Sequence, residues 1–78
     1  MVQLLFFAQI QEKVGQKQLE VEANGKTVKE IKDVFLAKYD IASLLEDAMV
    51  AINEEYATET DVVQSGDVVA FIPPVSGG

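Results

Sequence analysis

The sequence predicts an α+β fold: one mixed β-sheet of four to five strands, covered by one main helix and a few short helices. Two observations support this prediction. Short apolar stretches typical of strands lie near both ends of the 78-residue chain, and a longer stretch with helical spacing lies between them. A chain of this length forms one small core, so we expect a single domain spanning residues 1–78.

The first two strands are expected at residues 2–8 and 17–22, paired antiparallel. Alternation assigns the first strand's side chains to two partly apolar faces: Val2, Leu4, Phe6 and Ala8 on one, and Gln3, Leu5 and Phe7 on the other. In the second strand, Leu19 and Val21 point inward. The residues between the strands predict a short helical turn or loop, interrupted at Gly15.

The main helix is expected to begin after Thr27 and to continue to about Lys38. Thr27 and Glu30 have the S/T-x-x-E spacing of a capping box, in which each side chain bonds to the other residue's backbone amide. Spacings of three and four residues predict that one apolar stripe covers the sheet, formed by Val28, Ile31, Val34 and Phe35.

The remaining sequence predicts a short helix at residues 41–47 and strands at 48–53, 55–57 and 68–72, with Gly66 in the turn before the last strand. The first and last strands are the most apolar, so we expect them side by side at the centre of the sheet. Two strands, a helix and further strands in this arrangement describe the β-grasp, or ubiquitin-like, architecture.

The charge of the chain is unevenly distributed. Six lysines and 13 acidic residues give a net charge of −7. All the lysines lie within residues 13–38, so every charged side chain in residues 39–78 is acidic. Such a surface repels phosphates, so we expect no nucleic acid and favour basic protein partners; the alternative is a solvated acidic face with no special partner. No apolar run approaches the roughly 20 residues that span a bilayer, and no signal peptide is recognisable. We therefore expect a cytoplasmic protein that does not bind membranes.

The chain contains neither cysteine nor histidine. It therefore has no disulfide, no thiol nucleophile, no zinc site built on those residues and no triad that uses an imidazole. Its glycines form no phosphate-binding loop. We expect no metal site and no cofactor bound by the chain alone, and any covalent chemistry has few groups available.

The C-terminal sequence "AFIPPVSGG" offers one such group. Prolines after Ile72 favour an extended exit from the sheet, and Gly77 and Gly78 are slender enough to enter a narrow channel. Residues 73–78 are thus expected to form an extended, flexible tail that reaches about 20 Å. Activation of the Gly78 carboxylate as an acyl adenylate would let it be amidated or converted to a thioester or thiocarboxylate. The alternative is an inert tail.

Four segments carry a resemblance to a known family: "LLFFAQIQEKVG", "TVKEI", "VAIN" and above all "GDVVAFIPPVSGG". They resemble the small, sulfur-carrying subunit of molybdopterin synthase, over nearly the whole chain. Ile72 stands where this family often has a second aromatic residue. The stretches 39–49 and 57–64 match weakly.

The resemblance implies a mechanism. A ubiquitin-activating-like adenylyltransferase would use MgATP to adenylate Gly78, and a sulfurtransferase or cysteine desulfurase system would convert it to a thiocarboxylate. The tail (Pro73, Pro74, Val75, Ser76, Gly77 and Gly78) would enter the large subunit, which carries the catalytic residues. Sulfur would pass there to precursor Z, cyclic pyranopterin monophosphate, to build the molybdopterin dithiolene. Two large and two small subunits would form a heterotetramer, so the chain would not be an enzyme on its own.

The resemblance also implies a partner surface containing Phe7, Tyr56 and Ile72. Alternation agrees for Phe7 and Ile72, which follow Phe6 and Phe71 on the opposite faces of their strands. Ordinary packing is the alternative for each residue. Three other functions remain open: a sulfur carrier for thiazole synthesis, a ubiquitin-like modifier that forms isopeptide bonds through Gly78, and a plain ubiquitin-like binding module with an idle tail.

Overall fold

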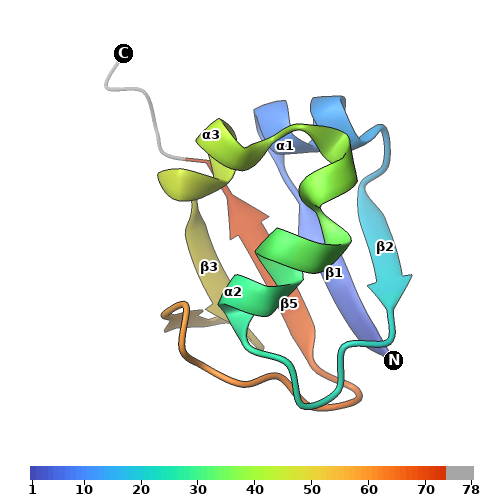
Figure 1. Cartoon of the computed structure of the whole chain (residues 1–78), viewed down its shortest axis with the longest axis vertical. Coiled ribbons are helices and arrows are strands. Elements are labelled where there is room, and N and C mark those ends of the chain that lie inside the picture. The colour runs from blue at the N-terminus through green and yellow to red at the C-terminus, as the bar shows by residue number, and fades with distance from the viewer. Residues whose placement is uncertain (74–78) are drawn as a thin grey trace.

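A computed structural model describes residues 1–73 of the chain, except for the side chain of Ala42. Five strands form one sheet in the order β2-β1-β5-β3-β4 (Figure 1). Their bounds are β1 Val2–Phe6, β2 Gln18–Val21, β3 Met49–Ile52, β4 Glu55–Ala57 and β5 Val68–Ile72. Strands β1 and β5 pair in parallel and the other neighbours are antiparallel. The predicted mixed sheet, with the first and last strands adjacent, is confirmed.

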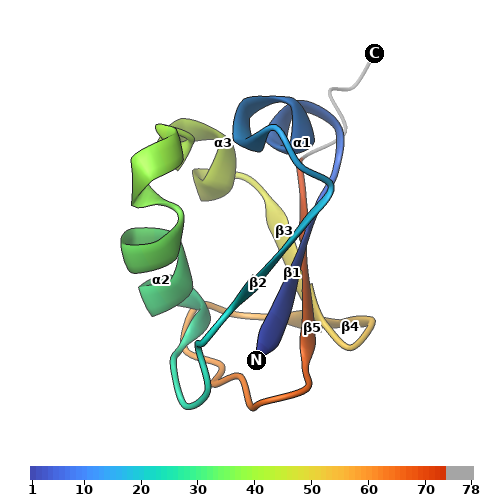
Figure 2. The same ribbon diagram turned by 90° about the vertical axis from the view of Figure 1, so that its right-hand side faces the viewer.

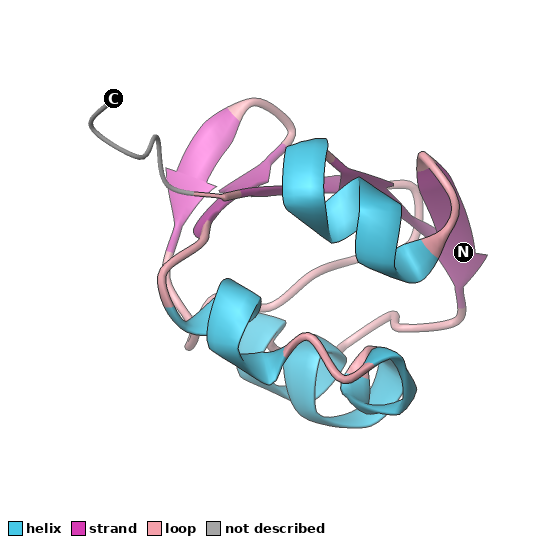
Figure 3. Ribbon diagram, turned by 90° about the horizontal axis from the view of Figure 1, so that it is seen from above, coloured by secondary structure: helices cyan, strands magenta, loops and turns pink. Residues whose placement is uncertain are grey.

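All the helices lie on one side of this sheet, which gives two layers (Figures 2 and 3). They are α1 Ala8–Val14, α2 Val28–Glu30, a π-helical turn at Ile31–Phe35, a 3₁₀ turn at Ala37–Tyr39, and α3 Ala42–Glu46. The sheet face turned away from the helices is the open face. The β-grasp prediction is therefore confirmed.

The core lies between the two layers and follows the predicted alternation. Val2, Leu4 and Phe6 of β1 are buried, and so are Val69 and Phe71 of β5. Phe6 pairs with Phe71 across the parallel ladder, and their rings stack with centroids 5.9 Å apart. Offset stacking of aromatic rings adds to the stabilisation from burial. This pair fixes the centre of the sheet beneath the helices.

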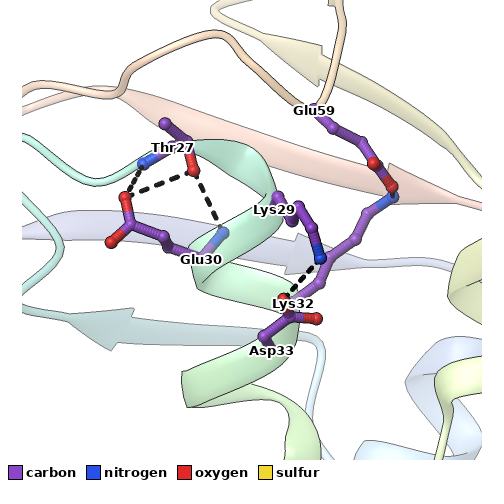
Figure 4. A network of polar contacts seen from close by, with 6 residues as sticks. All are labelled: Thr27, Lys29, Glu30, Lys32, Asp33 and Glu59. Carbon is purple, nitrogen blue, oxygen red and sulfur yellow. Dashed lines mark hydrogen bonds and ion pairs between the residues drawn. The ribbon is translucent and has the colours of Figure 1, made fainter.

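The capping box at the start of the main helix is present as predicted. The Thr27 side chain accepts a hydrogen bond from the Glu30 amide at 3.1 Å, and a Glu30 carboxylate oxygen accepts one from the Thr27 amide at 3.0 Å (Figure 4). One turn later, Lys32 Nζ lies 3.3 Å from the Leu45 carbonyl and 3.4 Å from Glu59 Oε1. Lys32 thereby connects the helix to α3 and to the loop after β4.

The predicted stripe on this helix is wrong at one position. Val34 is 67% exposed, whereas Leu36, which the stripe omitted, is buried. The cause is the π-helical turn, in which the Leu36 amide donates to the Ile31 carbonyl at 3.2 Å, five residues back. The wider turn places Leu36, rather than Val34, in line with Ile31.

Some predicted boundaries also need correction. The first strand ends at Phe6, not at residue 8, because Ala8 has a φ of 49° and begins α1. Ala8 therefore does not extend the core-facing set of β1. The strands expected at 17–22 and 48–53 are each shorter by one residue at both ends, whereas 55–57 and 68–72 agree.

Candidate functional site

The open face of the sheet carries an apolar row that crosses four strands. The ladders place Leu5 of β1 opposite Ala70 of β5, Ala70 opposite Ala51 of β3, and Ala51 opposite Tyr56 of β4. Residues directly opposite one another project from the same face. The row therefore has two small side chains at its centre and a large one at each end, which leaves a depression above the alanines.

This depression is an open hollow of about 310 Å³, called the hollow below. Its lining includes all three residues that the sequence assigned to a partner surface, Phe7, Tyr56 and Ile72. Phe7 is 43% exposed and Tyr56 is 76% exposed. Large apolar side chains exposed around one concavity are typical of a protein-binding surface. The structure thus brings the three residues together, and their contact with a partner stays a prediction.

A sharp turn after β1 positions Phe7. Phe7 has extended backbone angles, φ −124° and ψ 150°, and its carbonyl accepts hydrogen bonds from the amides of Ile10 at 3.1 Å and Gln11 at 3.4 Å. The chain then reverses through the left-handed backbone of Ala8. Phe7 is consequently held at the end of the hollow even though it is outside the strand.

A tight hairpin positions Tyr56. Strands β3 and β4 are joined by Asn53 and Glu54, and both residues line the hollow. The Asn53 side chain donates to Asp67 Oδ1 at 3.0 Å and accepts from the Val68 amide at 3.0 Å. The Gln64 amide, and after it the Asn53 side chain, donate hydrogen bonds that hold the pKa of Asp67 below its usual value. These contacts fasten the hairpin to the start of β5.

The far end of β5 leads to the predicted tail. Ile72 pairs with Met49, which is 44% exposed on the same face, and Pro73 beyond it is buried. Residues 74–78, including Gly78, lie outside the described part of the chain, so the roles expected for them stay predictions. What the structure does establish is that the hollow adjoins the strand that carries the tail.

Sequence reasoning missed much of the hollow's lining: Leu5, Ala51, Asn53, Glu54, Val68 and Ala70. Strand alternation placed Leu5 on the face opposite Leu4 and Phe6, but the register that aligns Leu5 with the alanines is a tertiary property. The described residues contain no group of three or more His, Cys, Asp or Glu residues suited to a metal ion. None of their helices is long and apolar enough to cross a membrane.

The fold and this face define a small ubiquitin-like domain whose open sheet surface lies beside the strand that leads to its C-terminal segment. Comparison with known families agrees with this class. The chain belongs to the ThiS family, whose model matches residues 4–78.

Individual relatives are more specific. The molybdopterin synthase sulfur carrier subunit of Escherichia coli K12 is 40% identical over 81 residues, covering 100% of both chains. The subunit of the same name from Arabidopsis thaliana is 34% identical, covering 99% of this chain and 82% of its own. The resemblance seen in the sequence motifs is therefore confirmed. Carriers of thiazole synthesis and protein modifiers are not favoured as alternatives.

A solved structure extends the comparison. It is a complex of subunits 1 and 2 of the molybdopterin-converting factor from Helicobacter pylori 26695. The matching chain is 26% identical, with a TM-score of 0.72, over 99% of this chain and 97% of that one. A relative of this fold therefore assembles with a second subunit.

Proposed function

We propose that the chain is the sulfur carrier subunit of a molybdopterin synthase and binds the large subunit of that enzyme. The observation that carries the proposal is that Phe7, Tyr56 and Ile72 surround one hollow. This hollow adjoins β5, the strand that leads to the tail. An exposed apolar hollow fits a protein partner better than it fits a polar substrate. The full-length relatives name the function, and the complex from H. pylori supports a second subunit as the partner.

Gly78 carries the sulfur in this proposal. An adenylyltransferase with MgATP joins AMP to the terminal carboxylate, because a free carboxylate has no good leaving group. The outer sulfur of a persulfide on a sulfurtransferase or cysteine desulfurase then attacks the acyl carbon and expels AMP. A thiol cleaves the sulfur–sulfur bond of the resulting acyl disulfide, forming a disulfide itself and leaving the thiocarboxylate. The large subunit, which supplies the catalytic residues, transfers this sulfur to precursor Z. Two carriers, each bearing a thiocarboxylate, are bound in a tetramer of two large and two small subunits. They donate their sulfur atoms in turn to form the dithiolene.

The residues of the chain account for this division of labour. The sequence has neither cysteine nor histidine to hold sulfur or catalyse its transfer, so the terminus is the group left to carry it. The cytoplasm, which provides ATP and a reducing environment, is the compartment that suits such a carrier.

Reconstitution with the large subunit, the activating enzyme, MgATP, a sulfur donor and precursor Z tests the proposal. The wild-type chain should yield molybdopterin. Deletion of Gly78, or extension by one residue, should abolish the product while circular dichroism shows an unchanged fold, because the reactive carbonyl is misplaced. Undiminished product from either variant would refute the carrier role.

A further inference from the structure

The β3–β4 hairpin contains a residue that does not suit its backbone. Its loop has two residues, since Ile52 pairs with Glu55 on either side, and φ is 51° at Asn53 and 70° at Glu54. Positive φ at both positions describes a type I′ turn, for which asparagine followed by glycine is preferred. Asparagine tolerates this region, whereas a glutamate Cβ is strained there. Local folding therefore does not explain Glu54.

The location of Glu54 suggests another reason. It lines the hollow beside Tyr56. Among residues 1–73 it is the only charged residue of that lining, whose side chains are mostly apolar. Within residues 1–73, the carboxylate of Glu54 takes part in no hydrogen bond or ion pair. The hairpin itself is held by Asn53, which bonds to Asp67 and Val68. Glu54 thus places an uncompensated negative charge at the rim of an apolar surface.

The lysines of the chain lie elsewhere. All six belong to residues 13–38, and both ion pairs that the described residues form, Lys29 with Asp33 and Lys32 with Glu59, use lysines of the main helix. Figure 2 shows the β4 hairpin projecting on the side of the sheet away from the helices. A surface that covers the hollow therefore meets the negative charge of Glu54, and a cation supplied by that surface would compensate it.

We propose that the large subunit places a lysine or arginine side chain against the Glu54 carboxylate while an apolar side chain of the same subunit fills the hollow. The inference rests on the proposed function and adds the chemistry of the partner surface. Glu54 is then a specificity-determining residue: it selects a basic partner and fixes the orientation of docking. Its strained backbone is the cost of presenting a charge where glycine would fold better.

Binding of the large subunit, measured by isothermal titration calorimetry at low and at high salt, tests this inference. Glu54→Gln retains the size of the side chain and should weaken binding about three- to tenfold at low salt, with a smaller difference at about 0.5 M salt. Glu54→Gly should weaken binding similarly and yet raise the thermal unfolding midpoint by roughly 4 °C, because it relieves the turn. For Glu54→Gly, weaker binding together with a higher unfolding midpoint is the expected result.

Glu55→Gln is the matched control. Glu55 is the next residue along the chain and is also exposed, but it pairs with Ile52 and projects from the opposite face of the hairpin. It should bind within about twofold of wild type. A loss below about threefold in Glu54→Gln, or an equal loss in Glu55→Gln, would overturn the inference. Ile72→Asp separates the two proposals: if it abolishes binding while Glu54→Gln does not weaken it, only the inference about Glu54 fails.

Discussion

Phe71 and Ile72 are neighbours in β5 whose side chains project from opposite faces of the sheet. Phe71 is fully buried and stacks on Phe6, whereas Ile72 lines the exposed hollow. One residue therefore holds the strand in the core, and the next presents an apolar side chain to a partner. The two functions of the strand, stability and docking, are separable by mutation.

Phe71→Ala is expected to destabilise the domain by about 3–5 kcal/mol, because it removes a buried ring and leaves a cavity against Phe6. In a domain of this size such a loss is a large part of the total stability. Urea unfolding followed by circular dichroism measures it. Ile72→Ala serves as the control, and equal losses in both variants would contradict the assignment of the two faces.

Ile72→Asp is expected to abolish detectable binding of the large subunit, since the aspartate would be buried unpaired in an apolar interface. The thermal midpoint should fall less than it does in Phe71→Ala, because Ile72 is only partly buried in the free domain whereas Phe71 is fully buried. Calorimetric titration and a melting curve on the same preparation measure the two effects. Binding at wild-type affinity would remove the open face from the proposed interface.

Ala70→Leu tests the hollow by filling it. Ala70 forms part of its floor, together with Ala51, and its side chain projects away from the core. A leucine there should leave the fold intact and weaken large-subunit binding at least tenfold, roughly 1.4 kcal/mol, because the entering side chain is displaced. Unchanged or tighter binding would show that no partner side chain occupies the hollow.

Acid should weaken the attachment of the β3–β4 hairpin. Hydrogen bonds from the Gln64 amide and the Asn53 side chain lower the pKa of Asp67 below 3.8, its ordinary value. A lowered folded-state pKa contributes stability that is present above the ordinary value and is lost as pH falls through the folded value. Melting points of wild type and Asp67→Asn should therefore differ at pH 7 and converge below about pH 3.8.

Asp47→Asn is the control for this pH series, because no hydrogen bond of the described residues uses its side chain. At pH 7 its melting point should lie closer to that of wild type than the melting point of Asp67→Asn does. A difference between wild type and Asp67→Asn that stays constant down to pH 2 would contradict a contribution from the ionised carboxylate.

Local patterns in the sequence predicted much of the fold. Alternation separated Phe6 from Phe7 and Phe71 from Ile72, and the spacing of Thr27 and Glu30 identified the capping box, because both patterns depend on nearby residues. The π-helical turn that buries Leu36 and the reversal at Ala8 had no such signal. They depend on how the helices pack against the sheet.

The candidate site was also predicted only in part from the sequence. Resemblance to a family supplied Phe7, Tyr56 and Ile72, and strand alternation supported two of them. That they surround one hollow depends on the register that aligns Ala51 with Ala70, which joins strands distant in the sequence. The sequence could have indicated a tight turn at Glu54, because a two-residue loop separates two predicted strands there. The positive φ of Glu54 is known only from the structure.

The intact mass of the chain shows whether Gly78 carries sulfur. The protein is incubated with MgATP, the activating enzyme and a sulfur donor, and the Gly78 deletion is treated in parallel. We expect a gain of about 16 Da, one oxygen replaced by sulfur, in the wild-type chain alone. An unchanged mass, or the same gain in the deletion variant, would contradict it.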